Sequence, residues 1–233
     1  MIPPLLHQTA KTADIPDRWR RFQKTVQDLH PGWTYRLWTD DENLAFVTVE
    51  YPEFLGAYLQ LPRNIMRADV IRYLIMYRLG GLYLDLDYEM LKPFDLVNEE
   101  IVLPLEKEGD IDSPNNTICQ AFFAAARGHP FFKMLIDELK AHPPVGEDAD
   151  VESSTGPRFV TKMYRRAREQ GMTFCTPDRS LFNPETPHTD REYRAIVDAG
   201  VAYGIHHCDG SWREWTLGQR LRNAVARTVK RLV

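Results

Sequence analysis

Apolar and polar positions along the chain follow two patterns, one typical of strands and one typical of helices. Short apolar or β-branched runs predict strands at 2–7, 34–39, 82–87, 101–105, 118–126 and 201–207. Longer segments of helical composition predict helices at 16–29, 41–49, 63–79, 130–139 and 158–170. Because strands alternate with helices, we expect an α/β protein with an open sheet and helices on both faces.

Polar segments rich in turn-forming residues separate these elements. They predict surface loops at 106–117, 142–154 and 172–190. The chain has 233 residues, which a single α/β core accommodates, so one domain is the economical interpretation.

Composition and charge narrow the function classes. The formal net charge of −4 gives no support for nucleic-acid binding. Three widely separated cysteines fit reduced thiols in a cytosolic compartment better than a disulfide framework. The sequence has no apolar run of about 18 residues or more and no signal-peptide pattern at its start. We therefore expect a cytoplasmic protein, with any membrane contact peripheral and on the inner face.

The clearest chemical signal follows Gly80, where a predicted helix meets a predicted strand. If the strand runs through residue 87, the side chains of Tyr83, Asp85 and Asp87 point to one face. Two neighbouring carboxylates repel each other unless a cation or a proton relieves the charge. Mg²⁺ and Mn²⁺ prefer such oxygen ligands and often bind phosphates at the same time. The pair therefore predicts a Mg²⁺ or Mn²⁺ site for a diphosphate at the carboxyl end of a strand, with a solvated turn as the alternative.

Two further pairs of residues are candidates for this site. Asp69 and Arg72 share a helix face. They could form an ion pair with each other, or they could contact hydroxyl groups of the substrate that carries the diphosphate. Adjacent His206 and His207 face opposite sides of a strand, so only one of them can join a metal. Neutral imidazole is a common ligand for Mn²⁺. Cys208 is interpreted as a packed thiol, since Mg²⁺ and Mn²⁺ prefer oxygen.

Five segments taken together resemble glycosyltransferase family 32, which contains a DXD sugar-binding region: 2–9, 37–40, 67–73, 80–87 and 206–212. The resemblance relates the chain to initiating α-mannosyltransferases and, more remotely, to the clostridial glucosylating toxins. It implies a GT-A fold, a Rossmann-like nucleotide-sugar-binding sheet, over residues 1–215. A basic amphipathic helix at 216–233 would follow; it could lie on an anionic membrane surface or pack on protein.

The resemblance also implies roles for individual residues. Asp85, Asp87 and Arg72 are the expected catalytic residues. The expected metal ligands are Asp87, Asp85 and His207, with His206 as a rival. The expected donor-binding residues are His7, Gln8, Thr9, Asp69, Arg72, Tyr83, Asp85, Asn116, Ser211 and Trp212.

The function implied is that of a retaining glycosyltransferase with Mn²⁺ or Mg²⁺. It would move a hexose from UDP-hexose or GDP-mannose to a glycan or a lipid-linked oligosaccharide. A front-face retaining reaction needs no carboxylate base, because the departing phosphate oxygen can take the acceptor proton. One alternative is a non-catalytic sugar-nucleotide or glycan-binding protein of the same fold. A phosphohydrolase of the haloacid-dehalogenase type is disfavoured, because Glu89 stands where that class usually has Thr or Val.

Overall fold

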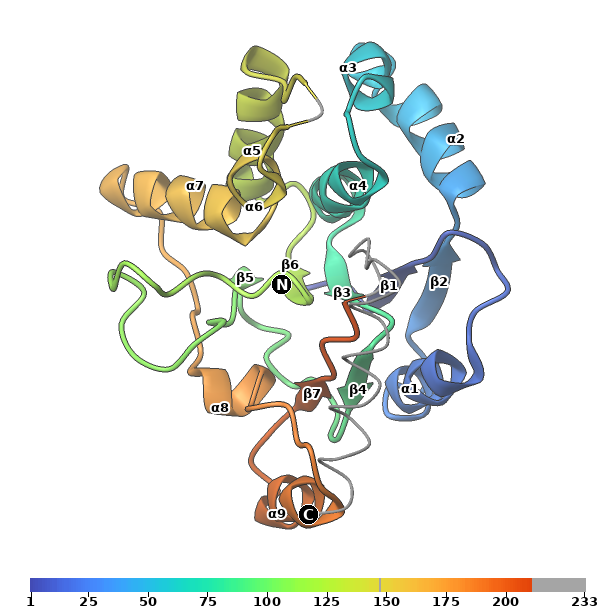
Figure 1. The fold of residues 1–233 in the computed structure, drawn as a ribbon, viewed down its shortest axis with the longest axis vertical. Helices are drawn as coiled ribbons and strands as arrows, with labels where there is room; N and C mark the ends of the chain where they lie inside the picture. Colours follow the sequence, from blue (N-terminus) through green and yellow to red (C-terminus); the bar gives the residue numbers. More distant parts are fainter. Residues whose placement is uncertain (147, 211–233) are drawn as a thin grey trace.

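The computed structural model describes residues 1–146 and 148–210, which form a mixed α/β fold around a central sheet (Figure 1). The strands of this sheet are β1 (Leu5–Thr9), β2 (Thr34–Trp38), β3 (Gly81–Leu84), β5 (Ile101–Val102) and β6 (Phe122–Ala125). Their order is β2-β1-β3-β6-β5. Strand β1 is parallel to β2 and β3, whereas β6 is antiparallel to β3 and β5. The predicted α/β class is confirmed.

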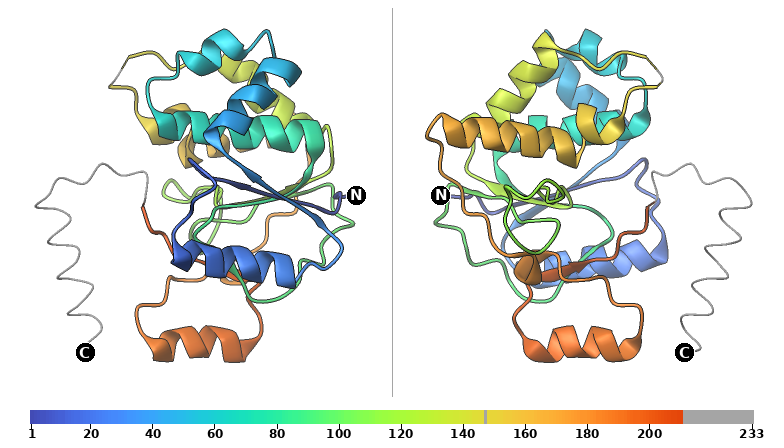
Figure 2. Two further views of the ribbon diagram at one scale, coloured as in Figure 1. Left: turned by 90° about the vertical axis from the view of Figure 1, so that its right-hand side faces the viewer. Right: turned by 60° about the vertical axis from the view of Figure 1, so that its left-hand side comes forward.

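Helices cover both faces of the sheet, as the sequence predicted (Figures 1 and 2). One face carries α2 (Asp40–Glu50), α3 (Leu55–Leu59), α4 (Asn64–Leu79), α5 (Pro130–Ala141), α6 (Val151–Ser154) and α7 (Pro157–Glu169). The other face carries α1 (Asp17–Asp28) and a small sheet of β4 (Tyr88–Met90) and β7 (Gly204–His206), with α8 (Arg179–Phe182) and α9 (Asp190–Ala199) near it. Two separate apolar clusters fill the two sides.

Helix α4 is the central helix of the first layer and is buried over most of its length. It packs against the sheet on one side and against α2, α5 and α6 on the others, which explains an apolar pattern that is not confined to one stripe. Two of its buried residues, Asp69 and Arg72, are charged. Buried charges of this kind require partners, and these partners define the candidate site.

Two glycines turn the chain from α4 directly into β3. Gly80 and Gly81 have φ angles of 66° and 103°, a region that side-chain-bearing residues rarely adopt. A Cβ on Gly81 would lie 2.6 Å from the carbonyl oxygen of Leu5 in β1. The absence of a side chain therefore lets β3 approach β1 closely and fixes where the aspartates emerge.

The structure differs from the predicted elements at several places. Strand β3 ends at Leu84, so Asp85 and Asp87 lie on the turn that leads into β4. The backbone N–H of Asp85 donates to Ala121 O, and that of Tyr88 donates to Asp85 O. The strand predicted at 118–126 is confined to β6. The segments predicted as loops contain the short helices α6 and α8, and α9 was not predicted.

The small sheet brings the end of the described chain to the aspartate turn. Strands β4 and β7 are antiparallel, and Tyr88 lies opposite His206. None of the helices among the described residues is long and apolar enough to span a bilayer. The basic helix predicted at 216–233 lies outside the described residues, as do Ser211 and Trp212.

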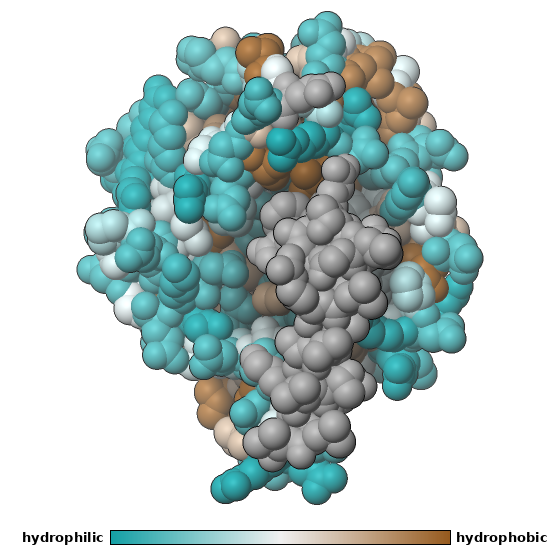
Figure 3. All heavy atoms as spheres, viewed as in Figure 1, coloured by the Kyte–Doolittle hydropathy of each residue, from teal (hydrophilic) through white to brown (hydrophobic). Residues whose placement is uncertain are grey.

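The face drawn in Figure 3 is mostly hydrophilic. Exposed large apolar side chains include Leu44 and Val49 on α2 and Leu59 on α3.

Candidate active site

The candidate site is built on the turn between β3 and β4. Tyr83, the third residue of β3, donates its hydroxyl to Asp85 Oδ1 at 2.9 Å. Gln8 Nε2 donates to the carbonyl oxygen of Asp85 at 3.2 Å. These contacts fix both the side chain and the backbone of Asp85 at the carboxyl end of β3.

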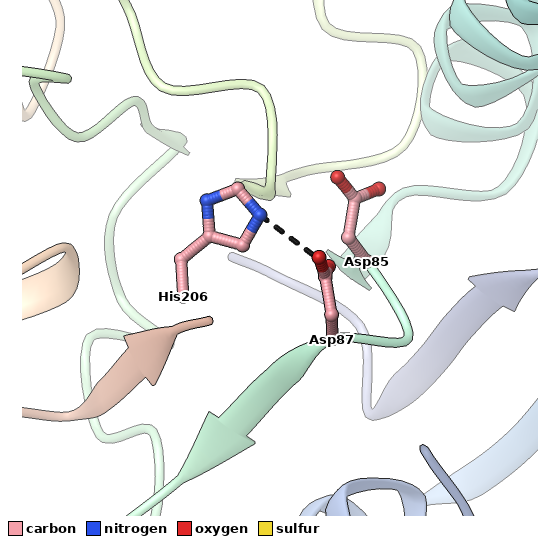
Figure 4. Close-up of side chains that lie close together, drawn as sticks. All are labelled: Asp85, Asp87 and His206. Atoms are coloured by element: carbon pink, nitrogen blue, oxygen red, sulfur yellow. Dashed lines mark ion pairs between the residues drawn. The ribbon is translucent and has the colours of Figure 1, made fainter. Parts of the chain in front are cut away.

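Three side chains converge at this turn (Figure 4). Asp85, Asp87 and His206 place one ligand atom each within 4.8 Å of one another. His206 Nε2 lies 3.3 Å from Asp87 Oδ1, and the second oxygen of Asp87 accepts a hydrogen bond from the backbone N–H of Asp209 at 2.8 Å. The three side chains keep 27%, 13% and 16% exposure, so a ligand can reach them.

Electrostatics couple Asp87 to His206. Burial alone would raise the pKa of Asp87, but the hydrogen bond and the charge of His206 outweigh it and lower that pKa. Burial alone would lower the pKa of His206, but its bonds to Asp87 and Cys208 raise it well above the ordinary value. Each group therefore favours the charged form of the other.

The donor set fits a divalent cation. Two carboxylates and one imidazole, which must lose its proton to bind a metal, offer oxygen and nitrogen ligands, a combination that suits Mn²⁺ better than Mg²⁺, which prefers oxygen alone. The sequence predicted Asp85 and Asp87 in this role, and the structure brings them together.

The structure differs from the prediction at the histidine. His207, the predicted ligand, points away from the aspartates, because neighbouring residues of an extended segment face opposite sides. Its Nε2 lies 2.9 Å from Glu89 Oε2, and its ring stacks on Phe22 at 4.3 Å between centroids. His206, which the sequence left as a rival, takes the place beside Asp87.

Arg72 links the helix to the turn. Its Nη2 lies 3.2 Å from Asp69 Oδ1 and its Nη1 lies 3.5 Å from Asp85 Oδ1. Its guanidinium also lies 5.1 Å from the centre of the Tyr83 ring. Burial would lower the pKa of Arg72, but Tyr83, Asp85 and Asp69 raise it above the ordinary range. Arg72 is therefore a fixed positive charge between two carboxylates.

Asp69 has a further partner that the sequence analysis did not assign. Thr155 Oγ1 donates to Asp69 Oδ2 at 2.8 Å, and the side chain of Gln120 bonds to the carbonyl of Thr155. Asp69 is 3% exposed and its carboxylate is held by Arg72 and Thr155. Thr155 is separated from Asp69 by 86 residues, and no local pattern predicts that contact.

The residues predicted to line the nucleotide pocket are mostly inside the fold. His7 is 2% exposed; its Nε2 bonds to Gly80 O at 2.9 Å, and its Nδ1 accepts from Trp38 Nε1 at 3.2 Å. Gln8 is fully buried. Thr9 is partly exposed, and its hydroxyl lies 2.8 Å from the hydroxyl of Tyr83. His7 and Gln8 therefore stabilise the backbone near the site from the protein interior.

Asn116 has a structural position as well. Its Oδ1 accepts from the backbone N–H groups of Lys107 and Thr117, and its Nδ2 donates to the carbonyl of Lys107. It is 2% exposed. This side chain fastens the loop that precedes β6.

A hollow of about 550 Å³ lies elsewhere, between α7 and the loop after β5. Its lining includes Tyr164, Arg168 and Phe174 and none of the predicted site residues. We therefore assign the site to the aspartate turn, where the charged groups converge.

Comparison with known proteins finds a matching family and related sequences. The family described as "Glycosyltransferase sugar-binding region containing DXD motif" matches residues 16–103. Inositol phosphoceramide mannosyltransferase 3 of Schizosaccharomyces pombe is 37% identical over 174 residues, which cover 72% of this chain and 46% of that protein. The initiation-specific alpha-1,6-mannosyltransferase of Candida albicans is 28% identical, covering 82% of this chain and 56% of that protein. The chain thus spans about half the length of the relatives it matches.

Solved structures agree at the level of fold. The PaToxG glycosyltransferase superposes with a TM-score of 0.51 at 12% identity, covering 99% of this chain and 87% of that one. The fold is therefore of the GT-A type, as the sequence predicted. The aspartates of the DXD motif are Asp85 and Asp87, and the chain belongs to the glycosyltransferase family defined by this DXD-containing sugar-binding region.

Proposed function

We propose that this chain is a metal-dependent retaining glycosyltransferase that moves a hexose from a nucleoside diphosphate sugar to a glycan or lipid acceptor. The observation that carries the proposal is the convergence of Asp85, Asp87 and His206 at one partly exposed turn. Family membership supports it, because the matched segment contains the same two aspartates.

The chain's residues have distinct roles in this proposal. Asp85, Asp87 and His206 would hold Mn²⁺ or Mg²⁺, with the imidazole favouring Mn²⁺. When bound, the cation neutralises charge on the departing diphosphate. Arg72 keeps Asp85 in place at 3.5 Å. Tyr83 orients the same carboxylate through its hydroxyl.

Retention is supported by how the neighbouring carboxylates are engaged. Asp69 is held by Arg72 and Thr155, and Glu89 is held by His207 and Tyr193. An inverting enzyme needs a carboxylate that is available to accept the acceptor proton. With these two acids engaged, we propose that a phosphate oxygen of the departing diphosphate accepts it instead.

The names of the relatives suggest which substrates to test first. The relatives are named as mannosyltransferases, and one of them acts on inositol phosphoceramide. We therefore place GDP-mannose before UDP-hexoses as donor. Among acceptors, an inositol-phosphate lipid comes before a lipid-linked oligosaccharide or a free glycan.

Turnover of nucleotide sugars with Mn²⁺ tests the proposal. Wild-type protein should release nucleoside diphosphate from one donor of a panel, and Asp87→Asn should lower that rate by at least about 100-fold, since a charged ligand is lost. Asp137→Asn, which changes an exposed acid on α5 paired with Lys133, should match the wild type. Binding of a donor without any turnover would favour the non-catalytic alternative, and neither binding nor turnover would contradict the proposal.

A further inference from the structure

Helix α1 contacts the segment that follows β7 at two residues of that segment, His207 and Asp209. Trp19 Nε1 donates to Asp209 Oδ2 at 2.7 Å, and Arg18 forms an ion pair with the same oxygen. One helical turn on, the ring of Phe22 stacks on His207. The Asp209 side chain is only 7% exposed, so this carboxylate is directed to α1 and not to solvent.

Helix α1 is also linked to the turn that carries Asp85 and Asp87. Gln23 Nε2 donates to the hydroxyl of Tyr35 at 2.7 Å, and that hydroxyl donates to Gln8 Oε1 at 3.0 Å. Gln8 in turn donates to the carbonyl of Asp85. Helix α1 is therefore connected by hydrogen bonds to both segments that carry the ligand side chains.

The contact between α1 and Asp209 also affects Asp87, because the turn at 206–209 contacts the Asp87 carboxylate. The backbone N–H of Asp209 bonds to one oxygen of Asp87, and His206 faces the other. Cys208, inside this turn, has a φ angle of 49°, which side-chain-bearing residues rarely adopt. Such a conformation persists only where the surroundings hold it, and the Asp209 side chain is held by α1.

We propose that Trp19, together with Arg18, is a positioning residue of the metal site. By holding Asp209, it fixes the turn at 206–209 so that the His206 imidazole and the Asp209 N–H both stay on Asp87. Trp19 itself touches none of the three ligands in the contacts described above. The inference rests on the proposed metal-dependent function and adds a residue from outside the DXD segment.

Mn²⁺ binding tests this role without any substrate. The variants are Trp19→Phe, which keeps an aromatic ring but removes the N–H donor, and Asp209→Ala. The dissociation constant of Mn²⁺ alone is measured from the free-ion electron paramagnetic resonance signal. Both variants should weaken binding by about tenfold or more, since residues that orient metal ligands contribute on this scale. Lys24→Ala, an exposed residue of α1 paired with exposed Asp28, should bind as the wild type does.

Hydrogen exchange of the metal-free protein is the second measurement, and it also detects a variant that has unfolded. In Trp19→Phe, a peptide covering residues 204–210 should exchange faster, while peptides from α4 keep their protection.

The outcomes separate this inference from the proposed function. Unchanged Mn²⁺ affinity in Trp19→Phe and Asp209→Ala, or unchanged exchange at 204–210 in Trp19→Phe, would overturn the positioning role and leave the proposed function standing. A wild type that binds no Mn²⁺ in the millimolar range would overturn both.

Discussion

Arg72 lies between Asp69 and Asp85, and both of its ion pairs with them are in or next to the protein interior. Removing one partner of a buried ion pair leaves an uncompensated charge, which usually costs about 3–5 kcal/mol. Arg72→Met should therefore lower the free energy of unfolding by about that amount in denaturant titrations. Arg78→Met, on the same helix but with a partly exposed ion pair to Glu50, should cost about 1 kcal/mol or less. Equal losses in the two variants would argue against a charge-balancing role for Arg72.

His7 makes a second residue-scale prediction, this time in pH. Burial, the largest effect, lowers the pKa of His7 from 6.5 to about 4. The unfolded chain therefore binds a proton that the folded chain does not, between about pH 6.5 and 4. The contribution of neutral His7 is fully present above pH 6.5 and is lost as the pH falls to 4, by about 3 kcal/mol.

The check is a series of unfolding midpoints from pH 7 to 4.5 for the wild type and for His7→Gln. The variant is expected to be less stable at pH 7, because hydrogen bonds to Gly80 and Trp38 are altered, but its stability should fall less steeply with acid. Parallel curves for the two proteins would show that His7 does not titrate in this way.

At the scale of elements, the α4–β3 junction depends on Gly81. Gly81→Ala introduces a Cβ against Leu5 O at 2.6 Å in a backbone conformation of φ 103°. Gly109→Ala is a matched control, because its φ of 97° is similar and nothing lies within 4 Å of the new Cβ. Gly81→Ala should lose at least about 1 kcal/mol more stability in thermal or denaturant unfolding, since the clash adds to the shared backbone strain. A loss no greater than that of the control would mean that β1 and β3 separate easily.

The elements that the sequence predicted are those with strong local signals. The predicted bounds of helix α4 and of strands β1 and β2 lie within three residues of the observed ones, because glycines mark the end of α4 and short apolar or β-branched runs mark the two strands. Helix α9 was missed although its sequence carries local signals. Thr189 and Glu192 form a capping box, and Tyr193, Ile196 and Val197 recur at helical spacing. Strand β4 was missed because its three residues follow the aspartates directly and pair only with β7.

At the scale of the whole molecule, the site joins segments that the sequence keeps far apart. Asp87 and Asp209 are separated by 122 residues, and Asp69 and Thr155 by 86. The residue types of the candidate metal site were predicted from the DXD motif and the paired histidines. The choice between His206 and His207 was not, because it depends on how β7 pairs with β4. The contacts of Thr155, Trp19 and Asp209 likewise arise only when the layers are assembled.

The central claim is that Asp85, Asp87 and His206 bind one divalent cation. A crystal structure with Mn²⁺ and a nucleoside diphosphate, with the metal located by its anomalous scattering, tests it directly. We predict a single Mn²⁺ bonded to oxygens of Asp85 and Asp87 and to His206 Nε2, with His207 remaining on Glu89. A metal bound by His207, or a nucleotide bound with no metal at the two aspartates, would contradict the account.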